Sequence, residues 1–466
     1  MTHSFHPSVL RDYDIRGIVG ETLSERDAWA IGRTFGTLVS RAGVSQASGS
    51  QASDRRIAVG YDGRISSPAL EAALVEGLNA SGIHVVRVGL GPSPMLYYAE
   101  AELGVDGGIQ ITGSHNPAEY NGFKMVFQHQ PFFGEDIQHL ARMAAAGDWV
   151  EATSPAGGET VDIMDRYVAR LMQGFDGKPF RIGWDAGNGA AGPVVEKLVK
   201  LLPGEHHTLF TDVDGHFPHH HPDPTEERNL GDLKALVAAK NLDFGVAFDG
   251  DGDRIGAVDG QGRVIWGDQL LAIFAETVLK ALPGATVIAD VKASQALFER
   301  VAALGGVPLM WKSGHSHMKS KMKETGSPLA GEMSGHIFFG HEYYGFDDAL
   351  YAAVRLIRAA SAPGRGVTAL HEAMPAMVNT PELRFPVEES RKFAVIEEVL
   401  ARLRAAGATV NAIDGARVTT ADGWWLLRAS NTQDMLVARA EAKDQVGLDR
   451  LMEQIDSQLA ESGARR

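Results

Sequence analysis

The sequence contains no cysteine among its 466 residues. This absence excludes disulfide bonds, thiolate metal sites and a cysteine nucleophile, and it fits a reducing compartment. Uncharged apolar runs long enough to span a bilayer are also missing. Residues 1–7 lack the basic region and apolar core that open a signal peptide. We therefore expect a cytoplasmic protein that has no membrane partner.

Basic residues are few relative to acidic ones. The chain has 44 Lys and Arg against 59 Asp and Glu, a net charge of −15. This balance argues against a nucleic-acid partner, and a phosphorylated ligand would need a local basic pocket. The length is too great for one hydrophobic core and indicates about three domains.

A short apolar strand that ends in aspartate, followed by a turn and a helix, recurs three times. The strands are predicted at 56–62, 180–185 and 286–290, with helices from about residues 67, 193 and 294. This pattern indicates α/β domains of similar build, each presenting a loop where α/β folds bind ligands.

After residue 379 the pattern changes to that of a smaller α+β domain. We predict a strand at 383–385, a helix at 392–406, strands at 424–428 and 435–439, and a C-terminal helix. The predicted domains are 1–159, 160–262, 263–375 and 376–466. Residues 40–54 are small and polar, which predicts a flexible surface loop.

The stretch Ile109–Lys124 begins as an apolar strand and breaks into the polar loop Thr112–Pro117. In this loop the hydroxyl of Ser114 stands beside the imidazole of His115. A serine on a short loop after a buried strand suits a covalent phosphoryl or acyl acceptor. A surface turn whose serine caps the backbone is the alternative.

Three aspartates alternate with glycine directly after the predicted strand 244–248. Asp249, Asp251 and Asp253 point to one side of an extended chain, which is costly unless a cation lies among them. Oxygen-only ligands favour Mg²⁺. An EF-hand loop is excluded, because its sixth position is Arg254 and its twelfth is Gly260. A solvated acidic turn is the alternative, and Arg254 could hold a phosphate against the metal.

Further cationic and hydroxyl-binding groups lie on predicted loops. Lys292 and the segment 311–316 add positive charge, and Gly331–His336 combines a glutamate, a serine and a histidine. Residues 428–432 (RASNT) place a guanidinium beside three hydrogen-bonding side chains, which suits a phosphate. A polar hairpin turn would have the same composition.

Two motifs favour other functions. Gly187–Gly192 (GNGAAG) with Asp212 twenty residues on matches a dinucleotide-binding fingerprint. His216, His219, His220 and His221 resemble a zinc tract, although the prolines among them favour a role in chain positioning.

With these loops taken together, the sequence resembles the α-D-phosphohexomutase family over essentially its whole length, in its bacterial phosphomannomutase/phosphoglucomutase branch. The motifs that carry the resemblance are 112–117, 249–254, 331–336 and 428–432. The resemblance implies three similar mixed α/β domains and a smaller α+β C-terminal domain around a central cleft.

The resemblance also implies roles for individual residues. Ser114 would be carried as phosphoserine and would hold Mg²⁺ together with Asp249, Asp251 and Asp253. The implied catalytic residues are Ser114, His115, Lys124, Arg254 and His336. The implied substrate-binding residues are Tyr13, Arg16, Lys292, His315, Glu332, Ser334, His336, Arg428, Ser430, Asn431 and Thr432. Gln433-Asp434 replaces the family's usual Thr-Pro, and we expect Asp434 to point away from a bound phosphate.

The implied activity is a reversible phosphoryl transfer between the 1- and 6-positions of glucose and mannose phosphates. It would run through a hexose 1,6-bisphosphate, with glucose 1,6-bisphosphate as activator, in a monomer whose partners are hexose phosphates. Whether His115, Lys124 or His336 handles the protons stays open. The alternatives are a phosphoglucosamine mutase, whose sugar loop usually has glutamine in place of Met333, a metal-dependent phosphatase, and a non-catalytic nucleotide-binding protein.

Overall fold

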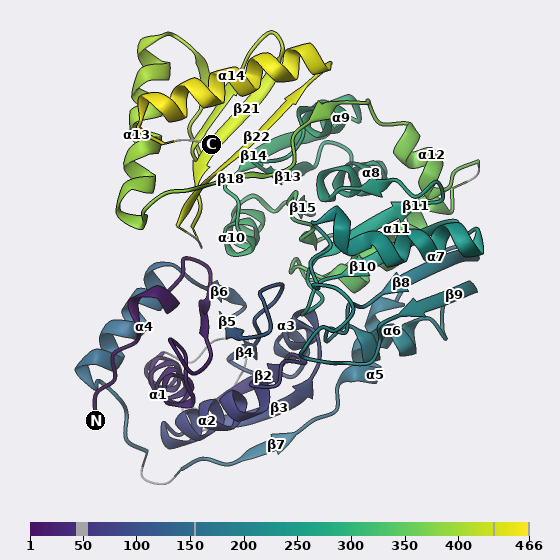
Figure 1. Cartoon of the computed structure of the whole chain (residues 1–466). Helices are drawn as coiled ribbons and strands as arrows, with labels where there is room; N and C mark the ends of the chain where they lie inside the picture. The colour runs from purple at the N-terminus through teal and green to yellow at the C-terminus, as the bar shows by residue number, and fades with distance from the viewer. Residues whose placement is uncertain (43–54, 153–154, 363, 432–433, 465–466) are drawn as a thin grey trace.

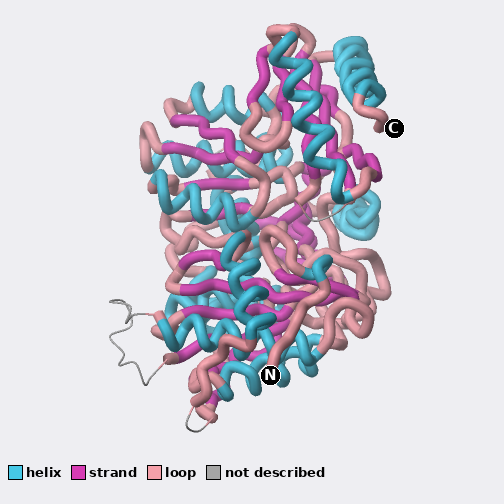
Figure 2. Tube along the Cα trace, turned by 90° about the vertical axis from the view of Figure 1, so that its left-hand side faces the viewer, coloured by secondary structure: helices cyan, strands magenta, loops and turns pink. Residues whose placement is uncertain are grey.

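The computed structural model describes residues 1–42, 55–152, 155–362, 364–431 and 434–464. These residues form four β-sheets that follow one another along an arc (Figure 1). Seen from the side, the strands of successive sheets lie one above another with helices beside them (Figure 2). The expectation of mixed α/β domains followed by a C-terminal domain of different build is confirmed.

The first sheet has the strand order β1-β5-β4-β2-β3-β7, with β6 beside β5. Its strands are β1 (Ile15–Ile18), β2 (Arg56–Tyr61), β3 (His84–Leu90), β4 (Gly107–Ile111), β5 (Tyr120–Phe127), β6 (Gln130–Phe132) and β7 (Gly158–Thr160). The helices of this region are α1 (Glu25–Arg41), α2 (Ser67–Ala80), α3 (Ser93–Glu102) and α4 (Glu135–Ala146), after a 3₁₀ turn at Pro7–Val9. Strands β4, β2, β3 and β7 run parallel, and β5 pairs antiparallel with both β1 and β4.

The second sheet has the order β12-β11-β10-β8-β9, and the third has the order β14-β13-β15-β16. Their strands are β8 (Phe180–Asp185), β9 (Gly204–Leu209), β10 (Phe244–Phe248), β11 (Ile255–Asp259), β12 (Val264–Ile265), β13 (Thr286–Asp290), β14 (Val307–Trp311), β15 (Leu329–Gly331) and β16 (Ile337–Phe339). The helices are α5 (Met164–Leu171), α6 (Gly192–Leu198), α7 (Gly231–Lys240), α8 (Gly267–Ala281), α9 (Gln295–Ala303), α10 (His315–Thr325), α11 (Ala349–Ala360) and α12 (Val367–Glu372), with a 3₁₀ turn at Glu227–Leu230.

The fourth sheet is antiparallel, in the order β17-β22-β21-β20-β19, with β18 also beside β22. Its strands are β17 (Val378–Asn379), β18 (Leu383–Pro386), β19 (Thr409–Asn411), β20 (Ala416–Thr419), β21 (Gly423–Ala429) and β22 (Met435–Ala442). Helices α13 (Glu389–Ala405) and α14 (Gln445–Glu461) cover one face.

The three repeated units are present as predicted. Strands β2, β8 and β13 each lie inside their sheet, and each is followed or closed by a buried aspartate, Asp62, Asp185 or Asp290. A buried carboxylate at a strand end needs donors, and it finds them in the neighbouring loops. These three aspartates therefore anchor the loops at the carboxyl ends of their strands.

Two local predictions need correction. Helix α1 continues through Arg41, so the predicted loop 40–54 begins later, and residues 43–54 lie outside the described residues. His315 was expected on a loop but begins helix α10. A helix that is long and apolar enough to cross a membrane is absent from the described residues.

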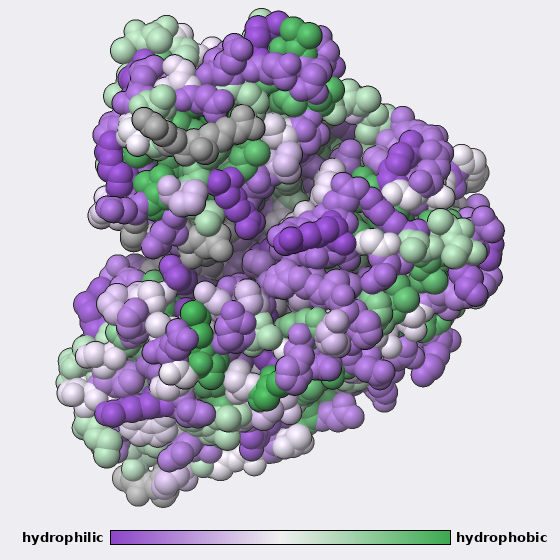
Figure 3. All heavy atoms as spheres, in the orientation of Figure 1, coloured by the Kyte–Doolittle hydropathy of each residue, from purple (hydrophilic) through white to green (hydrophobic). Residues whose placement is uncertain are grey.

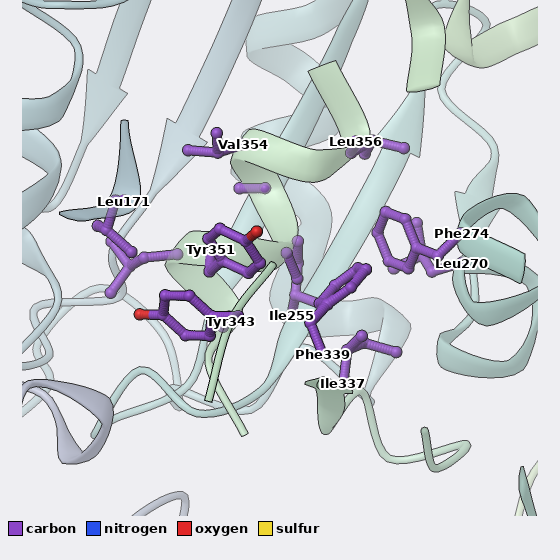
Figure 4. Close-up of a cluster of buried hydrophobic side chains, with 14 of the residues drawn as sticks. Leu171, Ile255, Leu270, Phe274, Ile337, Phe339, Tyr343, Tyr351, Val354 and Leu356 are labelled. Carbon is purple, nitrogen blue, oxygen red and sulfur yellow. The ribbon is translucent and has the colours of Figure 1, made fainter. Parts of the chain in front are cut away.

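The hydrophobic core joins the first three sheets. One cluster of buried side chains runs from Ala58 on β2 of the first sheet to Leu370 in α12. Figure 4 shows part of it, where Tyr351 on α11 stacks on Tyr343 and meets Phe339 edge-on. The fourth sheet has a separate core with α13 and α14. The surface is hollowed between the first and fourth sheets (Figure 3), and a cavity of about 390 Å³ opens there, lined in part by Asp12, Lys312 and Asn431.

Candidate active site

Ser114 lies in the turn between β4 and β5 and is 1% exposed. Its φ of +49° falls in the left-handed region that non-glycine residues seldom adopt. In this conformation its Oγ donates to Oδ2 of Asp249 at 2.9 Å and lies 3.2 Å from Nδ1 of His115. Strain of this kind persists only where the surroundings fix it.

Arg64 fixes the serine loop, and the sequence reasoning missed it. This buried guanidinium donates to the carbonyl oxygens of Ser114 (2.7 Å), Asn116 (2.6 Å), Pro117 (2.5 Å) and Tyr120 (3.0 Å). Asp62 pairs with it at 3.2 Å and also accepts from the Gly113 amide. Burial lowers the pKa of Arg64, and Asp62 opposes that shift. The arginine thus satisfies the carbonyls that the turn leaves unpaired.

The three aspartates of the 249–254 loop are fully buried, and their carboxylate oxygens lie within 4.8 Å of one another. Gly250 lets this loop approach the serine loop, because a Cβ on Gly250 would lie 2.4 Å from the Ser114 carbonyl oxygen. Burial and then the charges of Asp253 and Asp251 raise the pKa of Asp249 well above its usual value. Three carboxylates held this closely repel one another, which is why positively charged groups surround the cluster.

A divalent cation fits this cluster. Oδ1 of Asp251 is buried without a hydrogen-bond partner, Oδ1 of Asp253 faces Nε2 of His336 at 3.3 Å, and Ser114 adds a hydroxyl oxygen. Such all-oxygen donors are the ligands that Mg²⁺ takes. Lys124 on β5 donates to Asp251 at 2.7 Å and also to Asp253, so its amine and a cation compete for the same carboxylates. Although burial alone would raise the pKa of Asp253, Lys124 and His336 hold it well below its usual value.

His336 and Arg254 close the other side of the cluster. Nε2 of His336 lies 3.3 Å from Asp253, and its Nδ1 lies 3.1 Å from Glu332. Burial opposes the cationic form, but Asp253 and Glu332 outweigh it and raise the pKa of His336 to about 9. His115 has the opposite environment, because burial and Arg254 lower its pKa well below the usual value. The site thus pairs a cationic histidine with a neutral one.

Glu332 connects this cluster to the third sheet. Its Oε1 accepts from the Gly314 amide at 2.6 Å, and the Ser334 hydroxyl lies 3.0 Å from Nδ1 of His336. The rings of His315 and His336 are 5.7 Å apart. Asp347 is fully buried beside both rings, 3.9 Å from His315 and 4.0 Å from His336. Sequence reasoning missed Asp347, since no motif surrounds it.

A second cationic group lies against the fourth sheet. Lys292 pairs with Glu382 at 3.3 Å, and Arg428 on β21 donates to Asp414 at 3.1 Å. Although burial raises the pKa of Glu382, Lys292, Arg384 and Arg428 lower it to about 2. Glu382 and Asp414 were also missed by sequence reasoning. Each of these two cations has a carboxylate partner, and the oxygens of a bound phosphate can take the place of that carboxylate.

Tyr13 links three parts of the chain. Its hydroxyl donates to the Ser313 carbonyl at 2.8 Å and accepts from the Asn431 amide at 2.5 Å. Arg16, on β1, donates to Asn116 of the serine loop at 2.7 Å. Ser430 is buried beside Asn431, Asp434 is exposed, and Thr432 and Gln433 lie outside the described residues.

The two rival motifs pack against each other. His219 stacks on Phe210 with ring centroids 3.9 Å apart and contacts Asn188 at 2.7 Å, and His220 pairs with Asp185 at 3.0 Å. The Gly187–Gly192 loop in turn backs the aspartate loop, because the Ala190 amide donates to the Gly250 carbonyl at 2.9 Å. The histidine segment therefore packs against the glycine loop, and the glycine loop holds the aspartate loop in place.

Comparison with known proteins decides the family. Models of phosphoglucomutase/phosphomannomutase α/β/α domains I, II and III match residues 8–150, 165–262 and 266–377, and the C-terminal domain model matches 382–458. The chain belongs to the phosphoglucomutase/phosphomannomutase family. The predicted resemblance is confirmed.

Individual relatives of the family agree over almost the whole chain. A phosphomannomutase/phosphoglucomutase of Pseudomonas aeruginosa is 43% identical over 97% of this chain and 95% of its own. A phosphoglucomutase of Neisseria meningitidis is 42% identical over 96% and 95%. The crystal structure of a Burkholderia thailandensis phosphoglucomutase/phosphomannomutase family protein matches with a TM-score of 0.90 and 41% identity, covering 98% of each chain.

Proposed function

We propose that this protein interconverts the 1- and 6-phosphates of glucose and mannose through phospho-Ser114 and a hexose 1,6-bisphosphate. The observation that carries the proposal is the buried Ser114 hydroxyl, 2.9 Å from Asp249 at the edge of three converging carboxylates. The family membership supports the reaction class. The phosphoglucosamine mutase alternative is not favoured, because the relatives at 42–43% identity are named for glucose and mannose phosphates.

In the forward half-reaction, the bond between phosphorus and Oγ of phospho-Ser114 breaks as O6 of glucose 1-phosphate bonds to phosphorus. The proton of the O6 hydroxyl leaves to a base, and the bisphosphate forms. After the sugar has turned in the cleft, the bond between O1 and phosphorus breaks, Oγ of Ser114 regains a phosphoryl group, and O1 takes a proton. Such transfers need positioning and charge neutralisation, for which Arg254 and Lys124 are suited.

The protein groups for proton transfer differ in charge. His115 is held neutral next to Ser114, whereas His336 is held as a cation by Asp253 and Glu332. A neutral imidazole accepts a proton and an imidazolium donates one. Lys124 is the third candidate, because it leaves its carboxylates when a cation takes them. Mg²⁺, held by Asp249, Asp251, Asp253 and Ser114, would neutralise phosphoryl charge when bound.

Different residues bind the sugar hydroxyls and the distal phosphate of the substrate. Glu332 and Ser334 suit the 3- and 4-hydroxyls, which glucose and mannose share, while Tyr13, Arg16, Lys292 and His315 surround the ligand. Arg428, Ser430, Asn431 and Thr432 take the distal phosphate. Since the 2-hydroxyl is not read, both epimers are substrates.

Further parts of the proposal concern the whole protein. We propose domain boundaries near residues 159, 262 and 375, glucose 1,6-bisphosphate as activator, and a cytoplasmic monomer that binds hexose phosphates.

The test is mutase activity on glucose 1-phosphate, with Mg²⁺ and a trace of glucose 1,6-bisphosphate. Mannose 1-phosphate and glucosamine 1-phosphate run in parallel, with Ser114→Ala as control. The expected result is turnover of the first two substrates, lost in the variant. Preference for the amino sugar would indicate a phosphoglucosamine mutase, free phosphate without isomerisation a phosphatase, and no turnover of any substrate would refute the proposal.

A further inference from the structure

The loop that carries Lys292 connects β13 to α9 and lies on the fourth sheet (Figure 1). Its carbonyl oxygens are bound by two arginines of that sheet. Arg417 on β20 donates to the carbonyls of Val291 (2.5 Å) and Ala293 (2.8 Å). Arg439 on β22 donates to the Lys292 carbonyl itself.

The amides at the end of the same loop are bound by carboxylates. Glu441 on β22 accepts from the Ser294 hydroxyl at 2.9 Å and from the Gln295 amide at 3.1 Å. Asp268 on α8 accepts from the Ser294 amide at 2.8 Å and from Arg439 at 3.3 Å. Each of these four charged side chains is at most 3% exposed. Buried charges need close partners. Arg439 pairs with Asp268, and the Arg417 guanidinium lies 3.6 Å from the ring centroid of Trp424.

Strand register places this group on the sheet face that presents Arg428. Arg417 and Arg439 both pair with Leu426 across the strands, and Glu441 pairs with Trp424. Because alternate residues of a strand share a face, Trp424, Leu426 and Arg428 of β21 lie on the same side. Val291 completes a small apolar cluster there with Trp424 and Leu426. The opposite face carries Trp425 and Leu427 and packs into the separate core.

We propose that Arg439, with Arg417 and Glu441, is a positioning residue that fixes Lys292 relative to Arg428, so that the two cations bind phosphate as one unit. Three observations carry it: the donor on the Lys292 carbonyl, the shared sheet face, and Glu382, whose carboxylate both cations influence. This inference rests on the proposed function only in its choice of substrate. A role of Arg439 in positioning differs from a role in stability alone, because Arg439 then affects phosphate binding through the Lys292 side chain.

The test is a double-mutant cycle of Arg439→Met and Lys292→Met, read as the KM for glucose 1-phosphate and as the Kd for inorganic phosphate. If Arg439 acts through Lys292, Arg439→Met raises both the KM and the Kd about tenfold in the wild-type background. In the Lys292→Met background the same substitution raises them less than about twofold. Arg439→Lys keeps one donor for the carbonyl and is expected to restore most of the affinity. Arg450→Met, which removes an exposed arginine paired with Asp422 in the same domain, is the matched control and leaves both constants unchanged.

Equal weakening by Arg439→Met in both backgrounds would overturn the inference, and so would an unchanged Kd in the wild-type background. If Arg439→Met does not fold by circular dichroism, the same cycle is run with Arg417→Met, which removes the donors to the Val291 and Ala293 carbonyls, and it is judged by the same criterion. A wrong proposal for the function can be told apart from a wrong inference about Arg439. If the protein is not a mutase, the wild type shows no turnover, but the Kd values for inorganic phosphate still show whether Arg439 acts through Lys292.

Discussion

The cluster around Ser114 and the cluster around Arg428 are both buried and charged, yet they balance charge in opposite ways. At the serine end, three carboxylates converge, Oδ1 of Asp251 has no hydrogen-bond partner, and burial raises the pKa of Asp249. At the Arg428 end, cations and carboxylates alternate, and the pKa of Glu382 is lowered to about 2. The serine end offers a cation a buried carboxylate oxygen without a hydrogen-bond partner, whereas the Arg428 end offers an incoming anion cations whose carboxylate partners it can replace. We therefore propose phosphoryl transfer at the first cluster and phosphate binding at the second.

The largest effect is expected from Ser114→Ala. The variant removes the oxygen that would carry the phosphoryl group, so kcat falls by about 10⁴-fold or more, as for other lost nucleophiles. Binding of glucose 1-phosphate, measured by calorimetry, should change little because Arg428 and Lys292 remain. Substantial residual turnover in a coupled assay for glucose 6-phosphate would show that another group accepts the phosphoryl group.

The second largest effect is expected from removal of divalent cations, which should lower turnover at the Ser114 cluster and leave phosphate binding at the Arg428 cluster. We expect chelation with EDTA to lower kcat by about 10³-fold, corresponding to several kcal/mol of charge stabilisation. Phosphate binding at the Arg428 end should persist within about twofold, since its charges are already paired. Asp251→Asn is expected to reproduce the loss, with a raised Mg²⁺ requirement. If chelation reduced phosphate binding as much as turnover, the proposed division between a cluster for phosphoryl transfer and a cluster for phosphate binding would be wrong.

Arg428→Met tests the binding cluster itself. Loss of a charge-assisted contact with phosphate is worth about 1.5–3 kcal/mol, so the KM for glucose 1-phosphate should rise about 10- to 100-fold. The kcat at saturation should change less, because Ser114 and the aspartates are untouched. Arg428→Lys keeps the charge but not the two-pronged geometry and should lie between. An unchanged KM would remove Arg428 from the phosphate site.

The sequence predicted those parts of both clusters that follow one another along the chain. Ser114, the aspartate loop and the repeated strand–aspartate units occupy short motifs whose local geometry follows from glycine placement and strand alternation. Arg64, Asp347, Glu382 and Arg439 were missed, because each sits in an ordinary local pattern. Their roles depend on partners far along the chain, such as Arg439 and Lys292, 147 residues apart. Contacts of that kind are set by domain packing, which periodicity does not encode.

The smallest effect on phosphate binding is expected from Glu382→Gln, which alters the charge balance of the binding cluster without removing a cation. The pKa of Glu382 is lowered from 4.5 to about 2, so its carboxylate stabilises the folded state above about pH 4.5, and that contribution is lost as pH falls toward 2. The wild type should therefore exceed the variant by up to about 2–3 kcal/mol at pH 7, after allowance for partial exposure. Thermal melting at pH 7, 4.5 and 3.5 should show the gap constant between the first two values and narrowing at the third. At neutral pH the freed Lys292 should hold phosphate as well as before or more tightly. A stability gap that widens on acidification would mean that Glu382 is protonated in the folded protein, and the binding cluster would then resemble the serine end, where the pKa of a buried carboxylate is raised.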